Sequence, residues 1–180
     1  EEQIVDQATA ARTVAELRRQ AKPYTSWAGH YHDPVTPEEL RELAVIAAQN
    51  DLRVCVLADQ IPNVDAVLTA FEEADRYAGI RDKRYIIQHL QFATPRQLER
   101  MKALGLVIGV HPNNHIWKRG KRHLTPEGRQ QIDRVTPMRD LIDWDIPVTV
   151  ETDGSPIELL HAIWVLLARR ERETGEVIAP

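Results

Sequence analysis

YIIQHLQFATPRQLERMKALGLVIGVH, residues 85–111, is the stretch that decides the fold. It opens with a short apolar run, continues into a helix that Thr94 and Pro95 start and Gly105 stops, and returns to a second apolar run over 106–110. Short apolar runs rich in β-branched residues are typical of strands covered on both faces, as in a parallel sheet. The stretch therefore predicts a strand, a crossover helix and a parallel strand.

The same unit recurs on both sides of this stretch. Residues 52–58 form another predicted strand, between helices expected over about 37–49 and about 63–77. A fourth strand at 148–150 precedes a helix that runs to about residue 167. Four such units fit either a doubly wound sheet or part of an eight-stranded barrel. Because no glycine-rich phosphate loop follows any strand, the nucleotide-binding doubly wound sheet is the less favoured fold.

Polar residues follow three of the four predicted strands, which decides between the two folds. Gln88 and His89 follow the second strand, His111 the third, and Glu151 and Asp153 the fourth. Barrel enzymes carry their catalytic groups at these carboxyl ends. A whole barrel needs about 200–250 residues, so we predict an α/β fold that is a partial TIM (β/α)8 barrel, with strands 5 to 8 and their helices.

Three motifs, in this order, resemble amidohydrolase family 3, the branch of the metal-dependent amidohydrolase superfamily that includes N-substituted formamide deformylases. They are Gln88-His89-Leu90-Gln91, Val110-His111-Pro112 and Thr152-Asp153-Gly154-Ser155-Pro156, where the family has E-H-L-Q, V-Q-P and G-S-D-x-P. The resemblance covers about residues 37–180. It implies that 37–180 are barrel units 5–8 of one domain, and that 1–36 are a helix and loop before strand 5.

The resemblance also implies a site and a reaction. His89 would bind a divalent metal, with zinc expected from imidazole and carboxylate ligands, and Asp153 would be both a metal ligand and the catalytic general base. We expect His111, Asn114 and His115, in the long loop over 111–125, to contact the substrate. The implied activity is hydrolysis of an amide or formamide-like C–N bond, in a chain that is truncated and inactive alone.

Leu57, Gln88 and Asn114 are departures from the family pattern that bear on the metal site. Leu57 stands where the family has a metal-binding His at the end of the fifth strand, and Asp59 offers a substitute oxygen ligand. Gln88 replaces a Glu, and Asn114 stands where many members have a His. Because Leu57 cannot bind a metal, the alternative function is a degenerate barrel that binds a small molecule or acts as a regulatory protein.

The first 34 residues hold two further patterns. Apolar residues at three- and four-residue steps over 4–17 predict an amphipathic helix. His30 and His32 stand at alternate positions, which would place both side chains on one face of a strand, but exposed loop histidines are the favoured interpretation. The chain begins at Glu1 without an initiator Met, so we expect a fragment.

Composition restricts the partners. The 180 residues carry 23 Lys and Arg against 27 Asp and Glu, a net charge of −4, which is too acidic for a general nucleic-acid or anionic-membrane binder. The apolar runs are shorter than the ~20 residues of a membrane span, and the single Cys55 permits no internal disulfide and is expected to be a small buried hydrophobe. We expect a small-molecule substrate and a cytoplasmic location, and a homo-oligomer stays open.

Overall fold

The computed structural model describes residues 35–153 and 156–178. Four short strands form one fully parallel sheet in the order β1-β2-β3-β4. A doubly wound sheet reverses its strand order at a switch point, whereas a barrel adds every strand on the same side of the last. The order therefore confirms the prediction of an α/β fold with part of a TIM barrel. The strands are β1 (Cys55–Leu57), β2 (Ile86–Gln88), β3 (Val107–Val110) and β4 (Val148–Val150).

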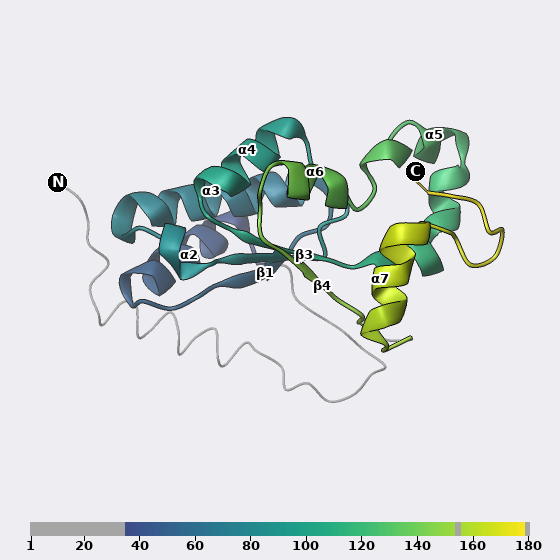
Figure 1. Cartoon of the computed structure of the whole chain (residues 1–180). Helices are drawn as coiled ribbons and strands as arrows, with labels where there is room; N and C mark the ends of the chain where they lie inside the picture. The colour runs from purple at the N-terminus through teal and green to yellow at the C-terminus, as the bar shows by residue number, and fades with distance from the viewer. Residues whose placement is uncertain (1–34, 154–155, 179–180) are drawn as a thin grey trace, which may run out of the picture.

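One group of helices lies on one side of this sheet, and a second group lies beyond the carboxyl ends of the strands. Helices α2, α3, α4 and α6 make up the first group, and α5 and α7 the second (Figure 1). Their bounds are α2 (Pro37–Gln49), α3 (Ile61–Ala78), α4 (Pro95–Ala103), α5 (Pro126–Arg129), α6 (Met138–Asp143) and α7 (Leu159–Ala168).

Helices α2 and α4 both begin at capping boxes. The Thr36 hydroxyl accepts a hydrogen bond from the Glu39 N–H at 3.2 Å, and the Glu39 carboxylate accepts one from the Thr36 N–H at 2.8 Å. Thr94 and Gln97 repeat the exchange at the start of α4. Each box satisfies two backbone donors that have no partner within the helix. Both helix starts therefore lie where the sequence predicts them.

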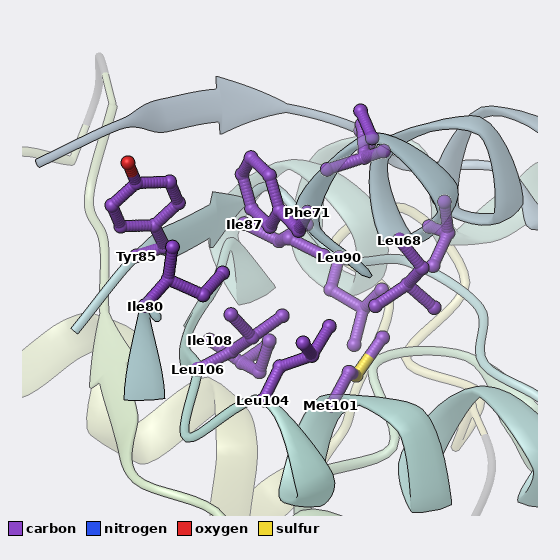
Figure 2. Close-up of a cluster of buried hydrophobic side chains, with 14 of the residues drawn as sticks. Leu68, Phe71, Ile80, Tyr85, Ile87, Leu90, Met101, Leu104, Leu106 and Ile108 are labelled. Carbon is purple, nitrogen blue, oxygen red and sulfur yellow. The ribbon is translucent and has the colours of Figure 1, made fainter. Parts of the chain in front are cut away.

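The hydrophobic core lies between the sheet and helices α2, α3, α4 and α6. Ile87 and Ile108 extend into it from neighbouring strands, and Met101 meets them from α4 (Figure 2). The Phe71 ring packs edge-on against Tyr85, with the ring centroids 5.0 Å apart. Each such fully buried side chain contributes about 1.5–3 kcal/mol relative to an exposed one. This packing fixes the sheet on which the polar strand ends stand.

The opposite face of the sheet is open in the part of the chain that the structure describes. Successive side chains on a strand alternate between faces: Val56 packs on the core, whereas Cys55 and Leu57 are exposed, Leu57 by 53%. The expectation of strands covered on both faces is therefore wrong here, and so is that of a buried Cys55. The helices of these units cover only one face, because the other face of a barrel strand packs against strands across the barrel.

The segment after β3, predicted as a loop over 111–125, contains helical turns. A π-helical segment spans Asn113–Lys118, and a 3-10 helix spans Gly120–Leu124. Helix α6 is also absent from the sequence prediction, since six residues are too few to show a helical period.

A buried hydrogen-bond network ties this segment to the sheet. The fully buried Gln91 side chain accepts a hydrogen bond from Gln60 Nε2 at 2.9 Å, and its own amide nitrogen lies 3.0 Å from His123 Nε2. His123 accepts that bond only while its Nε2 carries no proton. Burial lowers the pKa of His123 to about 4, so it remains neutral in the folded protein at pH 7.

No helix within residues 35–153 and 156–178 is long and apolar enough to cross a membrane. The helix predicted over 4–17 and the pair His30 and His32 lie outside the described residues.

We expect acid to destabilise the protein through His123. An unfolded histidine has a pKa of about 6.5, and His123 has one of about 4 when folded. The unfolded state therefore binds more protons between these values, and the free energy of unfolding falls as the pH decreases from about 6.5 to about 4, by up to roughly 3 kcal/mol.

Urea unfolding at pH 7 and pH 5 measures this loss in the wild type and in His123→Gln, which keeps an acceptor but does not titrate. The variant should lose less stability than the wild type, and an equal loss would contradict the assignment.

Candidate metal centre

Three polar side chains meet beyond the carboxyl ends of neighbouring strands. His89 directly follows β2, His111 directly follows β3, and Asp153 lies three residues after β4. One nitrogen or oxygen atom from each lies within 4.8 Å of the other two. Asp153 Oδ2 is 3.8 Å from His89 Nε2 and 3.7 Å from His111 Nδ1, and the two imidazole rings are 4.7 Å apart.

Two of these three residues have left-handed backbone conformations. The φ angle is +62° at His89 and +31° at Asp153, a region that non-glycine residues rarely adopt. Each such residue costs about 1–3 kcal/mol, and strain of this kind gathers at functional sites. The packed strands below hold both residues in conformations that local preference disfavours.

The two histidines have opposite electrostatic environments. The hydrogen bond with Glu151 raises the pKa of His89, burial opposes that rise, and the charges of Glu151, Asp153 and Asp59 add to it. Burial is the main cause that lowers the pKa of His111, and the charge of His89 lowers it further. His111 is thus a neutral imidazole, which is the form of histidine that binds metals.

The donors at this site fit a divalent metal. His111 is buried, and neither of its ring nitrogens has a hydrogen-bond partner among the described residues. A buried polar atom without a partner costs about 1–3 kcal/mol, and a metal ion next to it removes that cost. Two imidazoles and a carboxylate are ligands typical of zinc, and also of other first-row transition metals.

Glu151 contacts this cluster more closely than the sequence indicates, since its position suggests only support for Asp153. Its Oε2 lies 3.1 Å from His89 Nε2, and its side chain is 16% exposed. The sequence signals Glu151 only by its place at the end of β4. Its contact with His89 could not be predicted from sequence, because His89 follows β2 and the strand β3 lies between β2 and β4.

A pocket of about 300 Å³ opens beside the cluster. Of the three residues predicted to contact substrate, Asn114 and His115 line this pocket together with His89, whereas His111 belongs to the ligand cluster. Burial lowers the pKa of His115 to about 2, so its imidazole is neutral. The remaining lining residues are Leu57, Ala58, Asp59 and Arg119. A larger hollow, of about 620 Å³, lies between α3 and α4, away from the strand ends.

A buried asparagine holds the loop that carries Asp153. The Asn113 side-chain amide donates hydrogen bonds to the Thr152 carbonyl at 3.3 Å and to the Pro156 carbonyl at 2.9 Å. Its Oδ1 lies 3.1 Å from Nδ1 of His161 on α7. Asn113 therefore connects the segments on both sides of Asp153 to the π-helical segment and to α7.

An aromatic cluster extends this connection. The Trp117 ring lies 5.2 Å from that of His161 and 5.6 Å from that of Trp164, with both pairs nearly perpendicular. Edge-to-face pairs of this kind contribute about 0.5–1.5 kcal/mol beyond the area they bury. The π-helical segment and α7 are thus fixed to each other next to the site.

Comparison with known proteins identifies the family. The family model described as "Amidohydrolase family" matches residues 4–180, and the chain belongs to this family, as its motifs predict. A comparison with the curated proteins gives no significant match.

Solved structures of hydrolases share this fold. An uncharacterized metal-dependent hydrolase from Pyrococcus furiosus is 26% identical, with a TM-score of 0.54 over 74% of this chain and 26% of that one. An uncharacterized metal-dependent hydrolase from Pyrococcus horikoshii OT3 is also 26% identical. Its TM-score is 0.52, and the match covers 68% of this chain and 23% of that one. Aspergillus niger ochratoxinase is 17% identical and shares the fold, with a TM-score of 0.52. The match covers 74% of this chain and 29% of that one. The chain spans about a quarter of the length of these proteins.

We expect Asn113→Asp to destabilise the protein by about 2 kcal/mol. The change removes the two amide donors and places a carboxylate against the Thr152 and Pro156 carbonyls. Urea unfolding measures the cost. Asn114→Asp is the matched control, because the Asn114 side chain is only half-buried and has no hydrogen bond among the described residues. Equal costs for the two variants would show that Asn113 does not hold the loop.

Proposed function

We propose that this member of the amidohydrolase family is a metal-dependent hydrolase that cleaves an amide or formamide-like C–N bond. The observation that carries the proposal is the convergence of His89, His111 and Asp153 at the carboxyl edge of a parallel sheet. Membership of the family and the likeness to two metal-dependent hydrolases at 26% identity support it.

His89, His111 and Asp153 would hold the metal, for which zinc is our proposal. When bound, the ion lowers the pKa of a water molecule towards about 7 and polarises the carbonyl group of the substrate. His111, expected at first to contact substrate, is assigned to the metal because both of its ring nitrogens are buried without a partner, its Nδ1 lies 3.7 Å from Asp153 Oδ2, and its ring lies beside that of His89.

Asp153 is the proposed general base. Its side chain is 57% exposed, so its carboxylate is open to water and substrate while it remains close to both histidines. In the proposed reaction Asp153 accepts a proton from the attacking water and passes it to the nitrogen that leaves, as the C–N bond breaks and a C–O bond forms. The products are a carboxylic acid and an amine.

Asn114 and His115 are the proposed contacts to the substrate. Both line the pocket of about 300 Å³ next to His89, which is large enough for a small molecule. The neutral His115 ring and the Asn114 amide offer hydrogen bonds without a net charge, which suits a polar, uncharged amide group.

Leu57 favours a second candidate function. It ends β1 with an apolar side chain in the pocket beside His89, where a ligand would otherwise complete the site. A barrel that binds a small molecule without hydrolysing it would tolerate this residue.

Metal content and hydrolysis separate the two functions. We expect the purified full-length protein that contains these residues to retain about one equivalent of a divalent metal by elemental mass spectrometry, and to release amines from a panel of N-acyl and N-formyl amines. Removal of the metal with a chelator should abolish turnover, and zinc should restore it. A protein that binds small molecules but takes up no metal would establish the second function instead.

In the full-length protein, we expect Asp153→Asn to lower kcat by about 10²–10⁴-fold, the usual contribution of a general base. Folding should be unaffected, because the residue is exposed and asparagine tolerates its left-handed backbone. Asp133→Asn, which makes the same change of charge at an exposed position away from the cluster, is the control for steady-state kinetics and thermal unfolding. An unchanged kcat in Asp153→Asn would show that Asp153 is not the general base.

A further inference from the structure

Glu151 occupies a space that the neighbouring strand leaves for it. It directly follows β4, and its side chain crosses over Gly109 of β3. A Cβ atom placed on Gly109 would overlap Oε1 of Glu151. Any residue other than glycine at position 109 would therefore displace this carboxylate.

Of the Glu151 and Asp153 carboxylates, that of Glu151 is the nearer to Nε2 of His89. The distance to His89 Nε2 is 3.1 Å from Glu151 Oε2 and 3.8 Å from Asp153 Oδ2. Two ligand atoms bound to one tetrahedral zinc, each about 2.0–2.2 Å from it, lie roughly 3.2–3.6 Å apart. The Glu151–His89 separation of 3.1 Å is just below that range, so these two atoms could face one ion.

The other carboxylate oxygen has no partner. Glu151 Oε1 is buried and lacks a hydrogen bond from any described residue. Burying a charged oxygen without a partner is costly, and removing one partner of a buried pair leaves a penalty of about 1–3 kcal/mol or more. A cation bound to this carboxylate would offset this cost.

The strand ends make a carboxylate useful at this point. β1 ends in Leu57, which offers no ligand atom, and Asp59, two residues on, lines the pocket beside His89 but lies outside the cluster of His89, His111 and Asp153. His89, His111 and Asp153 offer three ligand atoms within 4.8 Å of one another, and Glu151, which contacts His89, would have to approach the other two to become a fourth. Catalytic zinc sites usually keep a fourth position open and can expand to five positions, so a fourth protein ligand would leave the fifth position for water or substrate.

We propose that Glu151 is a ligand of the divalent metal, with Gly109 as the residue that makes room for it. This inference rests on the proposed function, since it concerns the same metal. It adds a ligand that depends on a pair of residues on adjacent strands, Glu151 and Gly109.

Cobalt binding tests the proposal without any assay of activity. Co²⁺ is titrated into the metal-free wild type, Glu151→Gln and Gly109→Ala, with the dissociation constant taken from calorimetry and the ligand set from the visible absorption of the bound ion. Glu99→Gln, which makes the same change of charge on the exposed outer face of α4, is the matched control. Urea unfolding of each metal-free protein verifies that it is folded.

We expect Glu151→Gln and Gly109→Ala to bind Co²⁺ about 100-fold or more weakly, since even residues that only contact ligands change metal affinity by about 10–100-fold. Their absorption bands should differ from that of the wild type, because one carboxylate has left the ion. Glu99→Gln should match the wild type. If Gly109→Ala does not fold, the Glu151→Gln result decides alone.

Two results would overturn the inference. An absorption band in Glu151→Gln that equals that of the wild type, at any affinity, would mean that Glu151 only holds His89 in place. A wild type that binds no Co²⁺ would overturn the proposed function, and the inference with it. If the wild type binds Co²⁺ and the absorption band of Glu151→Gln is unchanged, the inference fails but the proposed function does not. The two failures are therefore distinguishable.

Discussion

Parallel pairing of four strands in their order along the chain is the constraint on which the site depends. Because all four strands run the same way, the residues that follow them are brought to one edge, although up to 64 positions separate them in sequence, from His89 to Asp153. The apolar contacts between the sheet and its helices hold that edge in place. The fold therefore positions the residues of the cluster, without help from polar contacts among them.

The site carries costs that the core has to offset. Two residues have left-handed backbones, one imidazole is buried without a hydrogen bond, and a carboxylate oxygen is buried alone. Each feature is unfavourable by about a kcal/mol or more. They occur together at the strand ends, while the core beneath consists of well-packed aliphatic and aromatic side chains. Local destabilisation at a site that a bound group relieves is the pattern expected of a binding centre.

Much of the fold could be predicted from local signals, whereas parts of the site could not. The capping boxes at Thr36 and Thr94 and the apolar strand runs are short-range patterns, and they placed the helices and strands within a few residues. The exposure of Cys55 depends on what covers the second face of the sheet, which the strand's own sequence does not encode. The contact between Glu151 and His89 depends on Gly109, a residue on a third segment, so no single motif contains it.

The aromatic cluster gives the site an optical property. Two of the chain's four tryptophans, Trp117 and Trp164, pack in one cluster with His161, whose ring contacts Asn113, the residue that holds both sides of the Asp153 loop. Indole emission depends on the polarity and the quenching groups around the ring, and a histidine at this distance is such a group. The part of the natural fluorescence that comes from Trp117 and Trp164 is therefore expected to respond to changes next to the site, with no attached dye.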